Sequence, residues 1–153
     1  MFYLLLLICS DRVYRFTDTA DSIDVIMPAH HTSPSRPYIL KKSDLFSMLE
    51  RPIPKGGSHY TQPGTGSYAG LYFKVLEKKQ DERPENEFFC YDLYKALGCE
   101  RYIVPTVLID DLSRHGKEYW VQISPQEPGK DLAKMVREQS QFLKTKPIDP
   151  ENY

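Results

Sequence analysis

The sequence has almost no net charge and few cysteines. Its 20 basic and 21 acidic side chains leave a formal net charge of −1 over 153 residues, which argues against the broad basic surface of a protein that binds nucleic acid or an anionic membrane. The three cysteines, Cys9, Cys90 and Cys99, form no CxxC pair and no Cys/His cluster, so we expect no zinc site. An odd, scattered set of cysteines is typical of reduced thiols, which favours a cytoplasmic location.

Long hydrophobic runs are also missing. The apolar run at residues 1–9 is well short of the roughly 20 residues that a membrane-spanning helix needs. No Lys or Arg precedes this run and no small-x-small cleavage site follows it, so it fits a signal peptide poorly. We expect no membrane span and a buried strand or a simple addition at the N-terminus; a secreted effector or an N-terminal anchor is the alternative.

The common phosphate-loop consensus sequences do not occur. Neither GxxxxGK[ST] nor GxGxxG is present, although five of the eight glycines fall in KGGSHYTQPGTGSYAG, residues 55–70. Turn-rich points on both sides of SHYTQ predict a hairpin. Glycine allows positive φ angles and a close backbone approach, so N–H groups can face an anion. From glycine content alone, an ordinary flexible hairpin is the stronger interpretation.

One lysine lies inside the most apolar segment of the chain. The run LYFKVL, residues 71–76, predicts a largely buried strand with Lys74 in its middle. Burying an ammonium group costs free energy unless an anion pairs with it. The alternative is an edge-strand lysine whose alkyl stem lies along apolar neighbours.

The segment PENEFFCYDLYKALG predicts a helix at about residues 84–97. Pro84 suits the first turn, acidic residues suit the positive end of the helix dipole, and Gly98 suits the C-terminal cap. Glu85 and Glu87 border the apolar stripe on opposite sides, so either could reach a strand lysine. The stripe, which we expect to face the core, comprises Phe89, Cys90, Leu93, Ala96 and Leu97.

The remaining segments predict an α+β fold. Short strand-like pieces at 12–16, 23–27 and 38–40 surround a Pro/Ser-rich loop, and Ser43 suits the N-cap of a short helix ending near Leu49. A strand at 102–109, a turn at 110–116, a strand at 119–123 and an amphipathic helix at 131–143 follow. We therefore expect an antiparallel sheet with one packed helix, plus a C-terminal helix. The expected regions are an N-terminal extension at 1–40, a lobe at 41–125, and a helix and tail at 126–153.

The order GLYFKV, ENEFFCYDLYKALG, YIVPTVLIDD and YWVQIS resembles the N-lobe of atypical kinases. It is similar to HipA-like kinases and to the bacterial phosphatidylinositol 3-/4-kinase-like group, which share a helix ending in Leu-Gly followed by Val-Pro and a strand. The resemblance covers about residues 55–125. It implies that residues 41–125 form a kinase-like N-lobe and that this lobe belongs to an ATP-dependent phosphotransferase.

The resemblance also implies a role for each matching residue. Lys74 would contact the nucleotide phosphates, and Glu87, with Glu85 as the fallback, would hold the lysine. A glycine-rich group would cover the phosphates, and backbone groups near a hinge at 120–123 would meet the adenine. The first group is Gly56, Gly57, Ser58, Gly64 and Gly66, and the hinge residues are Gln122 and Ile123.

The catalytic half of a kinase site does not occur in the sequence. No HxD…N segment followed by a metal-binding aspartate comes after residue 123, so Mg²⁺ would bind only if a C-lobe supplied its ligands. We expect a nucleotide-binding lobe that is inactive alone and is completed by a C-lobe chain or covered by self-association. The alternatives are a non-catalytic interaction or regulatory module with the same fold, and an unrelated small α+β domain.

Overall fold

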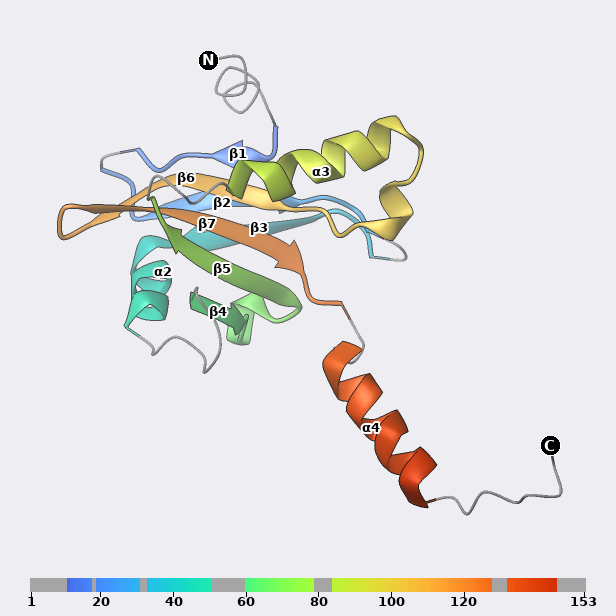
Figure 1. The fold of residues 1–153 in the computed structure, drawn as a ribbon. Helices are drawn as coiled ribbons and strands as arrows, with labels where there is room; N and C mark the ends of the chain where they lie inside the picture. Colours follow the sequence, from blue (N-terminus) through green and yellow to red (C-terminus); the bar gives the residue numbers. More distant parts are fainter. Residues whose placement is uncertain are drawn as a thin grey trace, which may run out of the picture.

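The computed structural model describes residues 11–17, 19–30, 33–50, 60–78, 84–127 and 132–145. Within these ranges two sheets and three α-helices form (Figure 1). The strands are β1 (Val13–Tyr14), β2 (Ser22–Met27), β3 (Arg36–Lys41), β4 (Tyr60–Pro63), β5 (Leu71–Glu77), β6 (Val107–Arg114) and β7 (Lys117–Pro125). The helices are α2 (Lys42–Leu49), α3 (Pro84–Ala96) and α4 (Leu132–Thr145), with 3₁₀ turns η1 (Gly66–Tyr68) and η2 (Glu100–Tyr102).

The main sheet has five strands in the order β1-β6-β7-β5-β4. All of its pairs are antiparallel except β1–β6, in which Val13 lies opposite Leu108 in a parallel register. The predicted α+β class is therefore confirmed, but the sheet is mixed because the N-terminal segment adds a parallel strand at its edge.

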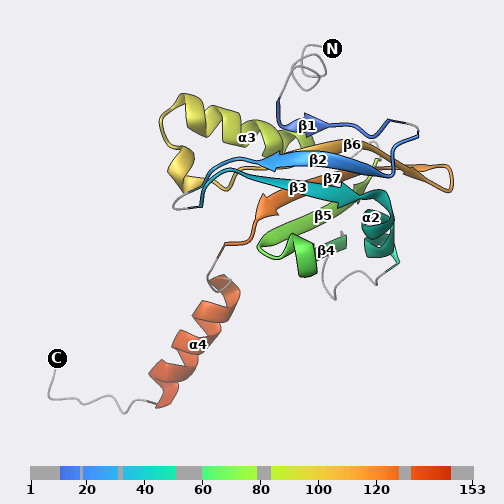
Figure 2. The same cartoon turned by 180° about the vertical axis from the view of Figure 1, so that it is seen from behind.

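The β2–β3 hairpin packs against one face of the main sheet and shares its core. Strand alternation turns Val25 and Met27 inward from β2 and Leu40 inward from β3, and they join one buried cluster with Phe73 and Ile109. Figure 2 shows this hairpin in front of the main sheet. Burial of each such side chain contributes about 1.5–3 kcal/mol. The segment predicted as an N-terminal extension is thus part of the same core as the sheet.

Helix α2 begins at Lys42, and the predicted Ser43 cap is wrong. Its N-cap residue is Lys41, and no side chain caps the helix. Tyr68, from η1, instead holds the first turn: its hydroxyl donates to Asp44 Oδ2 at 2.6 Å and accepts the Lys41 N–H at 3.1 Å. Burial and the hydrogen bond to Asp44 raise the pKa of Tyr68.

The β6–β7 hairpin is confirmed, but the turn predicted at 110–116 is wrong. Strand β6 runs to Arg114, and the reversal occurs at His115 and Gly116, which both have positive φ. A bulge between Ile109 and Leu112 turns both into the core. Asp110 can lie in this buried strand because Arg15 and Lys78 pair with it.

Candidate functional site

Lys74 lies in the middle of β5, an inner strand of the main sheet. It is opposite Thr61 of β4 on one side and opposite Gln122 of β7 on the other. Because β5 is paired on both sides, Lys74 is not an edge-strand lysine. Its side chain is half-buried.

Strand alternation assigns Lys74 to the sheet face opposite the hairpin. Residues of β5 and β7 that enter the main core are Leu71, Phe73, Val75, Val121 and Ile123. The intervening residues therefore face the other way, and Tyr72, Lys74 and Gln122 share the second face.

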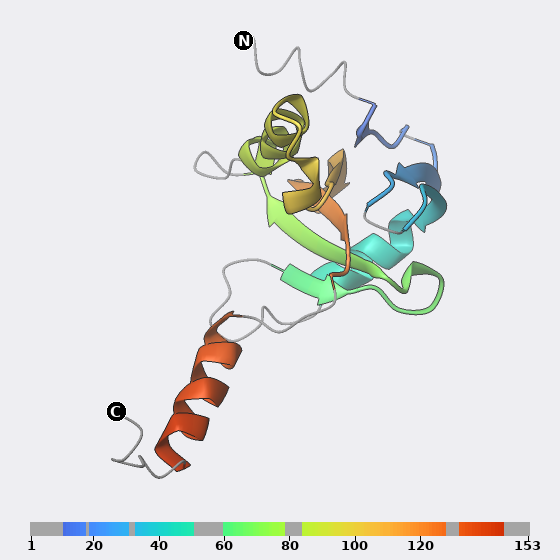
Figure 3. The ribbon, with the colours of Figure 1, turned by 90° about the vertical axis from the view of Figure 1, so that its right-hand side faces the viewer.

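Helix α3 covers part of this second face. Phe88 is fully buried against Leu108, with Phe89 and Trp120 packed beside it, and Leu108 lies opposite Gln122 in the β6–β7 ladder. Figure 3 shows α3 on one side of β5 and α2 on the other. Lys74 and α3 therefore occupy the same face of the sheet, as a pairing between a strand lysine and a helix acid requires.

Arg12 anchors α3 to the sheet. Its guanidinium donates to the Thr106 carbonyl at 2.7 Å and to Asp92 Oδ1 at 2.6 Å. It also lies over the rings of Phe88 and Tyr91, at 4.1 and 4.5 Å from their centroids. These contacts attach one side of the helix to the residue that precedes β1, and Arg12 in turn contacts the segment before β6.

This anchor determines which side of α3 is buried, and it corrects the predicted stripe. Phe88 and Tyr91 face inward, whereas Leu93 and Leu97 are 58% and 68% exposed and Cys90 is also exposed. The apolar spacing in the sequence favoured the opposite assignment. The difference arises because Arg12 contacts Phe88, Tyr91 and Asp92 on the other side of the helix. The apolar spacing within the helix carries no information about these long-range contacts.

The predicted acidic partners of Lys74 lie on α3. Glu85 and Glu87 fall in its first turns, but their side chains are outside the described residues, so a pairing with Lys74 stays a prediction. Gly56, Gly57 and Ser58 also lie outside the described residues. Strand β4, the next described element after them, places Tyr60 opposite Val75, which is adjacent to Lys74.

Gly64 and Gly66 shape the turn that joins β4 to β5. The Gly64 N–H donates to the Leu71 carbonyl at 2.7 Å, and a Cβ at Gly64 would lie 2.1 Å from the Tyr68 carbonyl oxygen. Gly66 has φ +59°, a left-handed conformation that glycine adopts readily. Both glycines thus have a structural role in a tight turn, and a phosphate contact by either stays a prediction.

Gln122 and Ile123 lie inside β7, which continues to Pro125. Both are paired with β5 and with β6, so their backbone groups belong to the sheet ladder. The strand end predicted at residue 123 is therefore wrong by two residues. The Gln126 N–H extends the pairing by donating to the Gly70 carbonyl at 2.7 Å, so a hinge can begin only beyond this point.

A cavity of about 330 Å³ opens where the chain leaves β7. Tyr72 and Ser124, which are cross-strand neighbours on the Lys74 face, form one wall. Val104, Pro125, Gln126 and Glu127 complete the lining. Tyr72 lies two residues before Lys74 in β5. An aromatic ring and polar groups this close to a lysine suit a planar ligand that carries a negative charge.

Sequence reasoning missed Tyr72, Ser124 and Arg12. Tyr72 had a usable signal, because it lies two residues before Lys74 and so shares its face of the strand. Ser124 had no signal of its own, because its place beside Tyr72 depends on the β5–β7 register. Arg12 had no local signal, because Thr106 and Asp92, to which it donates, are distant in the chain.

Metal-binding clusters and membrane-spanning helices are both absent from the described part of the chain. It holds no group of three His, Cys, Asp or Glu side chains that could bind a metal ion. None of its helices is long and apolar enough to cross a membrane. The chain matches no protein-family model, and no curated protein or solved structure is significantly similar to it.

Proposed function

We propose that the Lys74 face of the main sheet binds a nucleotide, ATP according to the kinase resemblance. The base would occupy the cavity beside Tyr72 and Ser124, and the phosphates would extend toward Lys74. A lysine ammonium on a rigid inner strand is a suitable partner for phosphate oxygens because it presents a fixed positive charge.

The observation that carries this proposal is the shared face of Lys74, Tyr72 and α3. The strand lysine, the helix that follows it and the cavity at the strand end lie on one side of the sheet. Glu87, with Glu85 as the fallback, would orient Lys74 from α3 before the nucleotide arrives. Gly56, Gly57 and Ser58 precede β4, which enters the sheet beside Lys74, so they are candidates for backbone contacts to the phosphates.

Phosphoryl transfer would need groups that the sequence does not contain. A kinase positions Mg²⁺ and the acceptor with aspartate and asparagine residues of a second lobe, and no such segment occurs in the 153 residues. We therefore propose nucleotide binding for this chain, with transfer possible only together with a C-lobe from another polypeptide segment.

Calorimetric titration with ATP and Mg²⁺ tests this function. Lys74→Ala should weaken ATP binding by about tenfold or more, because a hydrogen bond to a charged group contributes about 1.5–3 kcal/mol. Lys41→Ala, which removes an exposed strand lysine from the hairpin sheet, should leave the affinity unchanged. Failure of the wild-type protein to bind millimolar ATP would refute nucleotide binding by this chain.

A second candidate function, an interaction module, is favoured by the exposed side of α3. Leu93 and Tyr94 on α3, and Leu97 directly after it, are all solvent-exposed, and apolar patches of this kind are common at protein contacts. If they mediate self-association, Leu93→Ser combined with Leu97→Ser should reduce it in analytical ultracentrifugation. A wild-type protein that stays monomeric at high concentration would argue against that self-association.

A further inference from the structure

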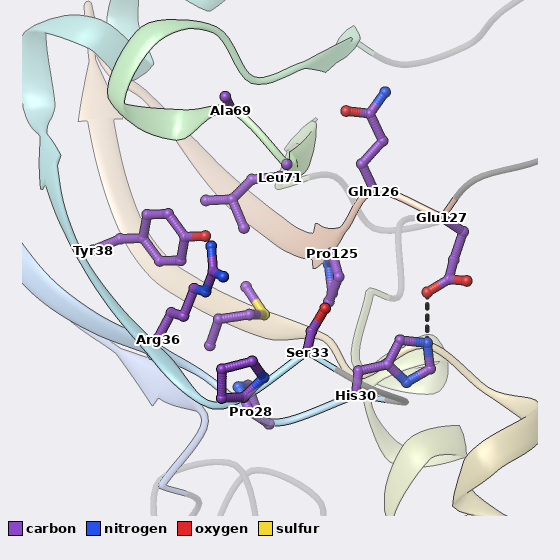
Figure 4. A pocket seen from close by; sticks show the side chains of 13 residues that line it. Pro28, His30, Ser33, Arg36, Tyr38, Ala69, Leu71, Pro125, Gln126 and Glu127 are labelled. Carbon is purple, nitrogen blue, oxygen red and sulfur yellow. Dashed lines mark ion pairs between the residues drawn. The ribbon is translucent and has the colours of Figure 1, made fainter.

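A second cavity, of about 320 Å³, lies on the opposite face of the sheet from Lys74 (Figure 4). It is bounded by the β2–β3 hairpin on one side and by the start of β5 and the end of β7 on the other. Met27, Pro28, Leu71 and Pro125 give it apolar walls. Leu71 is the neighbour of Tyr72 in β5, so the two cavities flank the same strand ends from opposite faces.

Arg36 brings a positive charge to this apolar cavity. In β3 the inward-facing row is Arg36, Tyr38 and Leu40, since Leu40 is fully buried and alternate residues share a face. Met27, the cross-strand neighbour of Arg36, is also buried. The arginine therefore extends the core-facing row of the hairpin into the cavity, where both Arg36 and Tyr38 form part of the lining (Figure 4).

Neither polar group is paired within the described ranges of the chain. Across the described part of the chain, the Arg36 guanidinium and the Tyr38 hydroxyl have no hydrogen bond or ion pair with another residue. A guanidinium offers a planar fork of donors that matches a carboxylate, and a phenol hydroxyl can donate to the same oxygen atoms. Together they form a donor set on one wall of the cavity.

The opposite wall carries a pair that joins the hairpin to the chain after β7. His30 Nε2 lies 2.5 Å from Glu127 Oε1, and the His30 side chain is buried. His30 also exchanges backbone hydrogen bonds with Ser33, at 3.0 and 2.8 Å. A single arginine facing a wall that contains a glutamate suits a ligand with one negative charge better than a phosphate dianion.

We propose that this cavity binds a small monocarboxylate with an apolar body. The carboxylate would pair with Arg36 and Tyr38, and the body would lie against Met27, Leu71 and Pro125. The residues that would pair with the ligand, Arg36 and Tyr38, lie on the hairpin and not on the Lys74 face of the sheet, whereas Pro125, Gln126 and Glu127 line both cavities. A bound ligand would contact both the hairpin and the start of the segment after β7, and would hold them together.

Titration of the ¹⁵N-labelled full chain with benzoate tests the proposal by NMR. Benzoate should shift the amide signals of Arg36, Tyr38, Gly70 and Leu71 with a common affinity. Benzamide, which lacks the charge, and phenyl phosphate, which can carry two charges, should each bind at least several-fold more weakly. Arg36→Gln should weaken benzoate binding on the order of tenfold, and Tyr38→Phe, which keeps the ring, should weaken it less.

Two variants serve as controls. Lys117→Gln removes an exposed cation at the start of β7, at the other end of that strand from Pro125, and Lys74→Ala removes the proposed phosphate ligand; both should bind benzoate as the wild-type protein does. The proposal is overturned if benzoate shifts no signals near Arg36, if Arg36→Gln and Tyr38→Phe bind it unchanged, or if phenyl phosphate binds more tightly. Loss of ATP binding in Lys74→Ala together with normal benzoate binding would separate the two sites.

Discussion

Arg12 donates a hydrogen bond to Asp92 at 2.6 Å across 80 residues of sequence, and this is one of several contacts by which Arg12 holds α3 on the sheet. The guanidinium is buried, whereas the Asp92 side chain is about half exposed. Removing the arginine should thus act mainly through the lost Thr106 hydrogen bond and the lost contacts with Phe88 and Tyr91.

Arg12→Leu should lower the free energy of unfolding by about 2–4 kcal/mol, because it removes buried hydrogen bonds and ring contacts together. Urea denaturation measures the change. Arg101→Leu is the matched control, since Arg101 is exposed and contacts the neighbouring Tyr102; its effect should be within about 0.5 kcal/mol. Equal effects of the two substitutions would show that Arg12 is not an anchor.

The buried side of α3 can be tested by two truncations on the same helix. Phe88→Ala should cost about 3–5 kcal/mol because it empties a fully buried site. Leu93→Ala should cost less than about 0.5 kcal/mol because that side chain is mainly exposed. If Leu93→Ala destabilises the protein more than Phe88→Ala in denaturation experiments, the buried side of α3 is the apolar stripe predicted from the sequence.

Tyr68→Phe should cost about 1 kcal/mol at neutral pH, because Asp44 and the Lys41 N–H lose their common partner. The pKa of Tyr68 is raised in the folded protein, so above about pH 10 the unfolded chain releases this proton first. The stabilisation by Tyr68 is therefore complete below that pH and is lost as the pH rises through the folded pKa. The difference in free energy of unfolding between wild type and variant should shrink above pH 10; a constant difference up to pH 11 would contradict this account.

Gly64→Ala should destabilise the protein by more than about 1 kcal/mol, because its Cβ would collide with the Tyr68 carbonyl oxygen. Gly66→Asn is the matched substitution in the same turn. Asparagine tolerates the left-handed conformation and Gly66 has open space around it, so we expect a smaller loss. Thermal unfolding of both variants measures the two effects, and a larger loss for Gly66→Asn would argue against this turn geometry.

The segments with strong local patterns were predictable from the sequence. The α+β class, helix α3 with its Gly98 cap, the strand around Lys74 and the C-terminal helix follow from periodicity and from capping residues. The extension of β6 through Asp110 was not predictable, because an aspartate in a strand depends on Arg15 and Lys78, which are far away in sequence. The orientation of α3 and the parallel pairing of β1 were not predictable either, because both depend on long-range contacts of the N-terminal segment.

The candidate site was predictable to a similar extent. Lys74 was identified because a charge within an apolar strand costs free energy unless an anion pairs with it. The structure places this lysine on an inner strand. The cavity beside it combines Tyr72, Ser124 and Val104 from three separate segments. Such a combination follows from strand register and chain path, which the local sequence pattern does not specify.

The most direct test of nucleotide binding compares ATP with adenosine in NMR titrations of the labelled full chain. We predict that ATP shifts the amide signals of Tyr72 and Ser124 and the side-chain signals of Lys74 with one common affinity. Adenosine, which lacks the phosphates, should shift the Tyr72 and Ser124 signals but leave the Lys74 side chain nearly unchanged. If millimolar ATP leaves Lys74 unchanged, or shifts only residues on the opposite face of the sheet, the proposed nucleotide site is wrong.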